Sequence, residues 1–345
     1  MNLREALLRL PKTDLHCHLD GSMRAETIMD IARKESVALG TDDLSELKKR
    51  LVSGRRVSTL ETFLKAFKLT TPVMQTREGI ERIAFELAED AAAENVRYLE
   101  VRFTPIWCVQ KGLSHREVML AAESGLKKAE ALYPIRTGLI ICAIRIREPG
   151  LSMELAQLAV SLKNDGVVGF DLAHAEQGNP AKEHAEAFQF AKKNGLGITV
   201  HAGEAYGPGS ISQAIKYCGA VRIGHGRTLC EDPALEQRVK ELGIAIECCP
   251  SSNVQINLTP SFADHPVRGY VQRGLIATLN TDNRLLTGIR VTDEYVRCAE
   301  ELHMTWEELK TTALNGFRAA FLPEDEKSAL SRAAQDEMNR ISLSS

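Results

Sequence analysis

The stretch His201-Ala202-Gly203-Glu204 contains residue types that could do chemistry. It follows Gly197-Ile198-Thr199-Val200, a short β-branched run typical of a buried strand, and it precedes a helix-like pattern that begins at Gly207-Pro208-Gly209. A histidine and a carboxylate at the end of a buried strand are suited to metal binding and proton transfer.

Three other stretches place polar groups of the metal-ligand type at the end of an apolar strand. They are Thr13-Asp14-Leu15-His16-Cys17-His18, Ile223-Gly224-His225-Gly226 and Leu279-Asn280-Thr281-Asp282-Asn283. The four stretches can act as one site only in a fold that brings several strand ends together.

The histidines and one aspartate of these stretches predict a metal site. His16 and His18 are two residues apart, so in a strand both side chains lie on the same face. This pair on its own is equally compatible with two unrelated histidines. With His201 and Asp282 it becomes a set of three imidazoles and one carboxylate, which suits a single zinc ion and leaves a position open for water. Zinc lowers the pKa of that water to about 7, which makes a nucleophile available at neutral pH.

Glu204 and His225 remain for proton transfer. Glu204 cannot easily bind the same ion as His201 if it turns toward a substrate, so we assign it proton donation. The alternative for a glutamate at a helix start is a solvated acid in the first turn. His225 is the candidate to orient or activate the attacking water.

Strands and helices alternate along most of the chain. The expected strands are 13–18, 96–103, 138–144, 167–172, 198–201, 221–224, 244–248 and 275–279. Helix starts are indicated by the capping box Ser114-x-x-Glu117 and by Asn179-Pro180 and Asp232-Pro233. Eight such units predict an α/β fold, a (β/α)8 TIM barrel whose active site lies at the carboxyl ends of the strands. A doubly wound sheet also alternates, but it would gather ligands from two or three strands, whereas candidate ligands here follow the first, fifth, sixth and eighth.

A helical insertion, at about residues 23–90, is expected between the first and second strands. Within it, Leu60, Phe63, Leu64 and Phe67 follow the i, i+3, i+4, i+7 spacing of one helix face. This face either packs in the core or forms an apolar lid over the barrel mouth. No interdomain linker is evident, so residues 1–345 are expected to form a single domain.

Composition excludes several classes of partner. The formal net charge is -3 and the basic residues are scattered, which argues against a nucleic-acid polymer or an anionic membrane as partner. No apolar run reaches the roughly 20 residues that a membrane span needs, and no signal peptide is recognisable, so we expect a cytoplasmic protein. The eight cysteines show no C-x-x-C spacing and are expected to be free thiols. Nothing in the sequence sets the oligomeric state.

Five motifs, in order along the chain, resemble those of the adenosine deaminase family within the amidohydrolases. The similarity runs from about residue 10 to about residue 325. The motifs are Thr13-Asp14-Leu15-His16-Cys17-His18-Leu19-Asp20-Gly21-Ser22, His201-Ala202-Gly203-Glu204, Arg222-Ile223-Gly224-His225-Gly226, Cys249-Pro250-Ser251-Ser252-Asn253 and Asn280-Thr281-Asp282.

The resemblance implies a zinc-dependent barrel that replaces the 6-amino group of a purine nucleoside by oxygen, with adenosine or deoxyadenosine as the expected substrate. It implies that His16, His18, His201 and Asp282 bind one zinc ion, that Glu204 protonates the ring nitrogen beside the reacting carbon, and that His225 orients the attacking water. It further implies that His18 and Asp20 contact the substrate, that Gly203 lies against the ring, and that the face from Leu60 to Phe67 forms a hydrophobic gate.

Two positions depart from the family pattern and bear on the substrate. Asn283 stands where many nucleoside enzymes have an aspartate that meets purine N7; an amide can donate a hydrogen bond there at any pH. His174 stands where many members have a glycine whose backbone N–H meets purine N3. Its imidazole either turns aside and bonds to a neighbour or alters recognition of the base and its N9 substituent.

Other functions remain open at this point. Adenine or a larger adenosine derivative such as aminodeoxyfutalosine could be the substrate, although Asp20 favours one that carries a sugar. Outside enzymology, the chain could be an inactive barrel used as a binding protein. Such a protein would have no reason to keep a metal-ligand set together with both proton-transfer residues.

Overall fold

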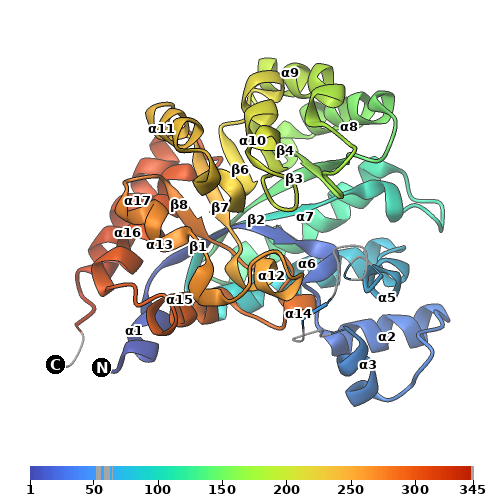
Figure 1. Ribbon diagram of the computed structural model, residues 1–345. Coiled ribbons are helices and arrows are strands. Elements are labelled where there is room, and N and C mark those ends of the chain that lie inside the picture. Colours follow the sequence, from blue (N-terminus) through green and yellow to red (C-terminus); the bar gives the residue numbers. More distant parts are fainter. Residues whose placement is uncertain (52–55, 58–62, 64, 343–345) are drawn as a thin grey trace.

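Eight parallel strands pair in chain order, β1 to β8, in the computed structural model of the protein (Figure 1). The structure describes residues 1–51, 56–57, 63 and 65–342. The strands are β1 (Lys12–His18), β2 (Val96–Phe103), β3 (Arg136–Ile144), β4 (Val167–Ala173), β5 (Gly197–Ala202), β6 (Arg222–His225), β7 (Ala245–Cys248) and β8 (Ala277–Leu279). All eight predicted strands are confirmed, each shifted by a few residues at most.

The barrel closes where the chain leaves β8 and passes alongside β1. Cys17 and Asp282 form a parallel bridge, the Asp282 N–H donates to the His16 carbonyl at 2.8 Å, and the His18 N–H donates to the Asp282 carbonyl at 2.7 Å. This closure confirms the predicted TIM barrel. It also brings three of the four candidate ligands onto neighbouring backbone segments.

Helices surround the strands as an outer layer (Figure 1). They are α1 (Leu3–Arg9), α2 (Ala25–Glu35), α3 (Leu44–Leu51), α5 (Phe67–Thr70), α6 (Arg77–Ala93), α7 (His115–Leu132), α8 (Pro149–Ser161), α9 (Ala185–Lys193), α10 (Pro208–Gln213), α11 (Pro233–Glu241), α12 (Pro250–Gln255), α13 (Val267–Gln272), α14 (Arg284–Thr287), α15 (Val291–Glu300), α16 (Trp306–Ala319) and α17 (Glu324–Met338).

Two of the three predicted helix starts are confirmed. Ser114 forms the capping box of α7, and the Asp232 side chain accepts from the Leu235 N–H at the start of α11. The prediction at Asn179 was wrong, because its amide donates instead to the Ala175 and Gln177 carbonyls, within the loop that follows β4. A local hydrogen bond inside the loop thus competes successfully with capping.

The segment between β1 and β2 holds α2, α3, α5 and α6 (Figure 1). Helix α6 packs against β2 and α7, as an ordinary outer helix of the barrel does. The predicted insertion at 23–90 therefore contains one helix of the ring in addition to the extra helices. In the predicted lid, Phe63 and Phe67 pack edge to face, with ring centroids 6.0 Å apart, and Leu60 and Leu64 lie outside the described residues.

Phe321 covers the amino end of the barrel. The Arg222 guanidinium lies 3.5 Å from the centroid of its ring, and a Cβ on Gly197 would approach the ring to 2.3 Å. The polar residues at or after the ends of β1, β5, β6 and β8 lie at the opposite, carboxyl end.

All eight cysteines are free thiols, as predicted, and only Cys230 is exposed. Among the helices of the described residues, none combines the length and the apolar character needed to cross a bilayer.

Candidate active site

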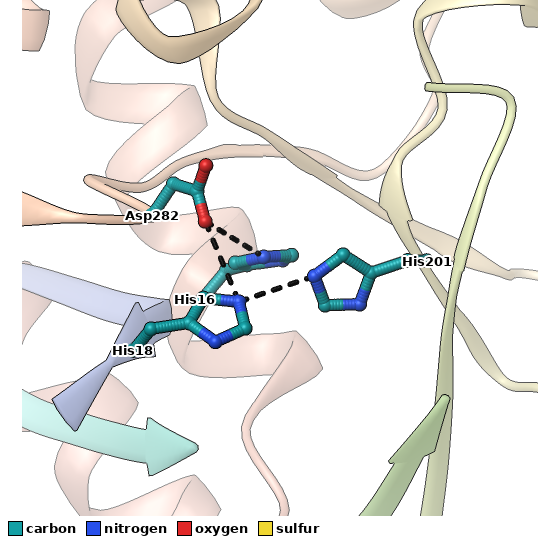
Figure 2. A group of neighbouring side chains, drawn as sticks. All are labelled: His16, His18, His201 and Asp282. Carbon is teal, nitrogen blue, oxygen red and sulfur yellow. Dashed lines mark hydrogen bonds and ion pairs between the residues drawn. The ribbon is translucent and has the colours of Figure 1, made fainter. Parts of the chain in front are cut away.

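Four side chains from three regions of the chain converge at the carboxyl end of the barrel (Figure 2). His16, His18, His201 and Asp282 each direct one potential ligand atom to the cluster, and these atoms all lie within 4.8 Å of one another. The structure thus brings together the complete set of predicted metal ligands. His16 lies deepest, with no exposed surface.

Strand pairing explains why these side chains meet. In the β5 to β6 register, His201 lies opposite Gly224, and Ala202 lies opposite His225. A Cβ on Gly224 would come within 3.0 Å of His16 Cε1, so any larger residue there would press on that imidazole. Glycine at this position leaves room for His16 between neighbouring strands.

Two buried carboxylates fix the tautomers of His16 and His201. His16 Nδ1 lies 2.9 Å from Glu247 Oε2, and His201 Nδ1 lies 2.9 Å from Asp171 Oδ2. Arg102 joins the two carboxylates, at 3.0 Å from Asp171 and 2.9 Å from Glu247. Because an ionised carboxylate only accepts hydrogen bonds, both imidazoles must carry their proton on Nδ1. In the neutral form of each imidazole, Nε2 is therefore the unprotonated nitrogen, and it faces the cluster.

The cluster is chemically suited to a cation. His16 Nε2 is buried without a hydrogen-bond partner among the described residues, and His18 Nε2 lies 3.1 Å from His201 Nε2. Asp282 Oδ1 lies 3.5 Å from His16 Nε2 and 3.4 Å from His18 Nε2. Burial lowers the pKa of His18 and His201, which keeps both imidazoles neutral. Lone pairs that face one another in this way fit a zinc ion held by three nitrogens and one oxygen.

Glu204 and His225 lie together beside this cluster. Glu204 Oε1 is 3.6 Å from His225 Nε2, and both side chains are buried. Burial raises the pKa of Glu204 well above its usual range, and the negative charges of Asp282 and Glu176 raise it further. A carboxyl group that stays protonated at neutral pH can donate a proton.

A chain of hydrogen bonds sets the orientation of His225. The Val267 N–H donates to His265 Nδ1 at 3.3 Å, so His265 carries its proton on Nε2, which lies 3.2 Å from Asn253 Oδ1. The Asn253 amide then donates to His225 Nδ1 across 3.1 Å. In this assignment, which follows from the network, His225 is a neutral imidazole with its N–H on Nε2, on the side of Glu204.

A cavity that is open to solvent lies over these residues. Of the predicted substrate contacts, His18, Asp20, His174 and Asn283 line it, whereas Gly203 is not among the described lining residues. Phe63 and Phe67 line it as well, together with Thr104, Trp107, Cys142, Ile144, Ala173, Ser252 and Ile256.

His174 forms a local hydrogen bond and also lines the cavity. Its Nδ1 accepts from the Ala175 N–H at 2.9 Å. Its ring nevertheless lines the cavity and meets Trp107 edge to face, with centroids 6.3 Å apart. The backbone has a φ of +83°, a conformation that is unfavourable for a residue with a side chain.

Several residues of the site escaped the sequence analysis. Asp171, Glu247 and Arg102 support the candidate ligands, and the Ser252 hydroxyl donates to Asp282 Oδ2 at 2.6 Å. Glu176 contacts the loop that contains Glu204. The available signal was a charged residue within an otherwise apolar strand, as at Asp171 in β4 and Glu247 in β7, because such a group is buried only when it is paired.

Comparison with known proteins gives a family match over nearly the whole chain. Residues 11–336 match the family model described as adenosine deaminase. The chain is 37% identical over 324 residues to an adenosine deaminase of Clostridium perfringens, which covers 94% of this chain and 98% of that protein. It is 41% identical over 296 residues to an adenosine deaminase of Vibrio vulnificus, covering 86% of this chain and 89% of the relative.

Solved structures with the same fold include other deaminases. An adenine deaminase from Arthrobacter aurescens superimposes with a TM-score of 0.89 at 26% identity, over 95% of this chain and 99% of that one. A zinc-bound amidohydrolase from Burkholderia ambifaria has a TM-score of 0.89 at 25% identity, over 98% and 93%. The N6-methyl-AMP deaminase of Arabidopsis thaliana has a TM-score of 0.85 at 27% identity, over 96% and 98%.

Proposed function

Because this chain belongs to the adenosine deaminase family, we propose that it hydrolyses adenosine and deoxyadenosine to the corresponding inosine and ammonia. The observation that carries the proposal is the buried carboxyl group of Glu204, whose pKa is raised by burial, beside four converging metal-ligand side chains in one cavity. An acid and a metal-ligand set in one cavity suit the addition of water to an electron-poor ring.

His16, His18, His201 and Asp282 would hold one zinc ion. When bound, zinc lowers the pKa of water to about 7 and so supplies a nucleophile at neutral pH. Asp171 and Glu247 hold the Nδ1 protons of His201 and His16, so Nε2 carries the lone pair in the neutral imidazoles, and Ser252 orients the Asp282 carboxylate.

Glu204 would give its proton to ring nitrogen N1 as the water oxygen bonds to C6. Protonation of N1 neutralises the negative charge that would otherwise develop on the ring. His225, with its N–H on Nε2, would donate a hydrogen bond to the attacking oxygen and so orient it toward C6. The C6–N6 bond then breaks, and the amino group takes one proton of the added water and leaves as ammonia. The other proton of the water restores the carboxyl group of Glu204.

Asp20 and Asn283 would recognise the rest of the substrate. Burial raises the pKa of Asp20 to about 7, and its Oδ1 has no protein partner among the described residues, so it can accept a hydrogen bond from a sugar hydroxyl. Asn283 also lines the cavity, and its amide can donate to N7. Of the two contacts, that of Asp20 favours a purine that carries a sugar.

The charge of the cavity favours an uncharged nucleoside over a nucleotide. Its described lining includes Asp20, Glu204 and Asp282 but no lysine or arginine. Phosphate groups are bound in proteins chiefly by guanidinium, ammonium or helix N–H groups. We therefore expect AMP to be a much poorer substrate than adenosine, in contrast to what the name of the Arabidopsis N6-methyl-AMP deaminase implies for that enzyme.

Adenine is the second candidate substrate, because an adenine deaminase shares this fold over almost the whole chain. An adenosine derivative with a larger 5′ group, such as aminodeoxyfutalosine, is a third. Ammonia release from adenosine, deoxyadenosine, adenine, AMP and a 5′-modified adenosine distinguishes them. An inactive binding protein would release ammonia from none and would contain no metal.

The proposed chemistry is tested by two variants. Glu204→Gln should keep zinc at the wild-type level while its kcat falls by about 100-fold or more, since general acid catalysis contributes about 10²- to 10⁴-fold. His201→Ala should lose the ion as well as the activity. Full activity of Glu204→Gln would refute the proton-donor assignment.

A further inference from the structure

We propose that Glu176, together with Arg145, is a positioning residue that fixes the loop of Glu204 and thereby aims its carboxyl group at the substrate. The inference rests on the proposed function of Glu204 as proton donor. Neither residue contacts the cavity among its described lining, so both would act through Glu204.

Glu176 lies in the loop after β4, and its carboxylate accepts four hydrogen bonds from the segment after β5. Its Oε1 accepts from the Gly203 N–H at 2.8 Å and from the Ser210 hydroxyl at 2.6 Å. Its Oε2 accepts from the N–H groups of Ala205 at 2.7 Å and Tyr206 at 2.9 Å. The side chain is buried, with 3% of its surface exposed, and all four acceptor positions of the carboxylate are used.

The hydrogen-bonded N–H groups lie on both sides of Glu204 in the sequence. Three backbone N–H groups within four residues point at one carboxylate, which is possible only in a sharply turned loop, and Gly203 has the positive φ of +66° that this turn needs. On the opposite side of the turn, Thr228 donates its N–H to the Gly203 carbonyl at 3.0 Å. The backbone that carries Glu204 is therefore held from two directions.

Arg145 holds the start of the same loop. Its guanidinium donates to the His201 carbonyl and, at 3.2 Å, to the Asn179 carbonyl. It is buried with 3% exposure, as Glu176 is, and the negative charge of Glu176 offsets the desolvation of its guanidinium. Two buried residues of opposite charge, from the loops after β3 and β4, thus bind the carbonyl and N–H groups of one turn.

Such a clamp matters because proton donation depends on position. A misplacement of about 1 Å in a catalytic group can cost on the order of 100-fold in rate. The groups that face Glu204 are His225 from β6, Asp282 from the segment after β8, and the charges of Glu176, Arg145 and Arg227. The negative charge of Glu176 also favours the protonated form of Glu204.

The experiment compares Glu176→Gln with Glu130→Gln in the zinc-loaded enzyme. Glutamine keeps the size of the side chain but offers one acceptor oxygen and adds an N–H₂ group that faces N–H donors. Glu130 is the matched control because its carboxylate also accepts from a backbone N–H and a hydroxyl, both of Thr137, but at the amino end of the barrel. Each variant is assayed for kcat and KM with adenosine, zinc content and Tm.

We expect the kcat of Glu176→Gln to fall by about 100-fold, with KM changed by less than about 3-fold and zinc content unchanged. Glu130→Gln should have a lower Tm than the wild type but the same kcat. Equal kcat in the two variants, or a loss of kcat in proportion to lost zinc, would overturn the proposal. If Glu176→Gln fails to fold, Ser210→Ala removes one of the four hydrogen bonds. It should lower kcat about 3- to 10-fold, and an unchanged kcat there would also overturn the proposal.

A double variant shows whether Glu176 acts through Glu204. In single-turnover assays with excess enzyme, Glu176→Gln/Glu204→Gln should be no slower than Glu204→Gln alone, because the group to be positioned is already gone. A further 100-fold loss would mean that Glu176 acts elsewhere. If Glu204→Gln itself keeps full kcat, the proposed function of Glu204 fails, whatever Glu176 does.

Discussion

Replacing Asp171 by asparagine is expected to weaken zinc binding by about 10- to 100-fold, although Asp171 is not one of the four candidate ligands. Its carboxylate accepts from His201 Nδ1 at 2.9 Å and from Arg102 at 3.0 Å, and it has no exposed surface. An asparagine of the same size keeps one acceptor oxygen and gains an N–H₂ group. His201 Nδ1 and Arg102 both donate to Oδ2, and the Leu172 N–H donates to Oδ1 at 2.7 Å. The N–H₂ group of an asparagine therefore faces a donor in either orientation, and the negative charge beside His201 is lost.

The loss reaches the metal through the tautomer of His201. Without an ionised carboxylate at Nδ1, the imidazole more readily carries its proton on Nε2, where it cannot bind a cation. A 10- to 100-fold weaker affinity corresponds to about 1.4–2.7 kcal/mol of binding free energy. Arg102 keeps its contact with Glu247 at 2.9 Å, so the guanidinium is not left without a charged partner.

The dissociation constant of zinc is measured by competition with a chromophoric chelator, for the wild type, Asp171→Asn and Glu130→Gln. Glu130→Gln also removes a hydrogen-bonded carboxylate, but at the amino end of the barrel, so its zinc affinity should equal that of the wild type. Asp171→Asn should regain much of its kcat in excess zinc. Wild-type zinc affinity in Asp171→Asn would refute the reasoning.

Three further predictions concern other parts of the structure. His174→Gly should change the relative kcat/KM for adenosine, adenine and 5′-modified adenosines, since the imidazole lines the cavity; an unchanged profile would mean that the ring only packs against Trp107. Phe63→Ala should raise KM for adenosine about 10-fold, equal to about 1.4 kcal/mol of lost contact, because the ring lines the cavity and is buried; an unaltered KM would remove it from the substrate site. Burial raises the pKa of Glu294 to about 8, above its unfolded value of about 4.3, so the folded protein holds an extra proton between these values and the free energy of unfolding falls as pH rises through them. The free energy of unfolding, measured in urea at about pH 5.5 and about pH 8.5, should differ less between the two pH values for Glu294→Gln than for the wild type. An identical difference in the two proteins would contradict this assignment.

The pattern of elements is largely a local property of the chain, which is why it could be predicted. Strands show either alternating apolar and polar residues or a short apolar run. Caps such as Ser114 and Asp232 accept a hydrogen bond from an N–H group only three residues further along the chain. The error at Asn179 has a local origin too, because two hydrogen bonds of similar strength competed for one side chain. The sequence does not distinguish α6, which packs in the ring, from the extra helices before it, because the spacing of apolar residues in a helix is the same in both positions.

The sequence alone determined the types of the candidate ligands and the strand ends that present them, since His16, His18, His201 and Asp282 follow apolar strands that only a barrel gathers together. Tertiary structure decided how they are held. His16 meets Glu247 across 231 positions of the chain, and Asp282 reaches His16 and His18 only because β8 returns to β1. The tautomers of the histidines, the protonated state of Glu204 and the grip of Glu176 depend on such distant contacts, and no local spacing in the chain encodes them.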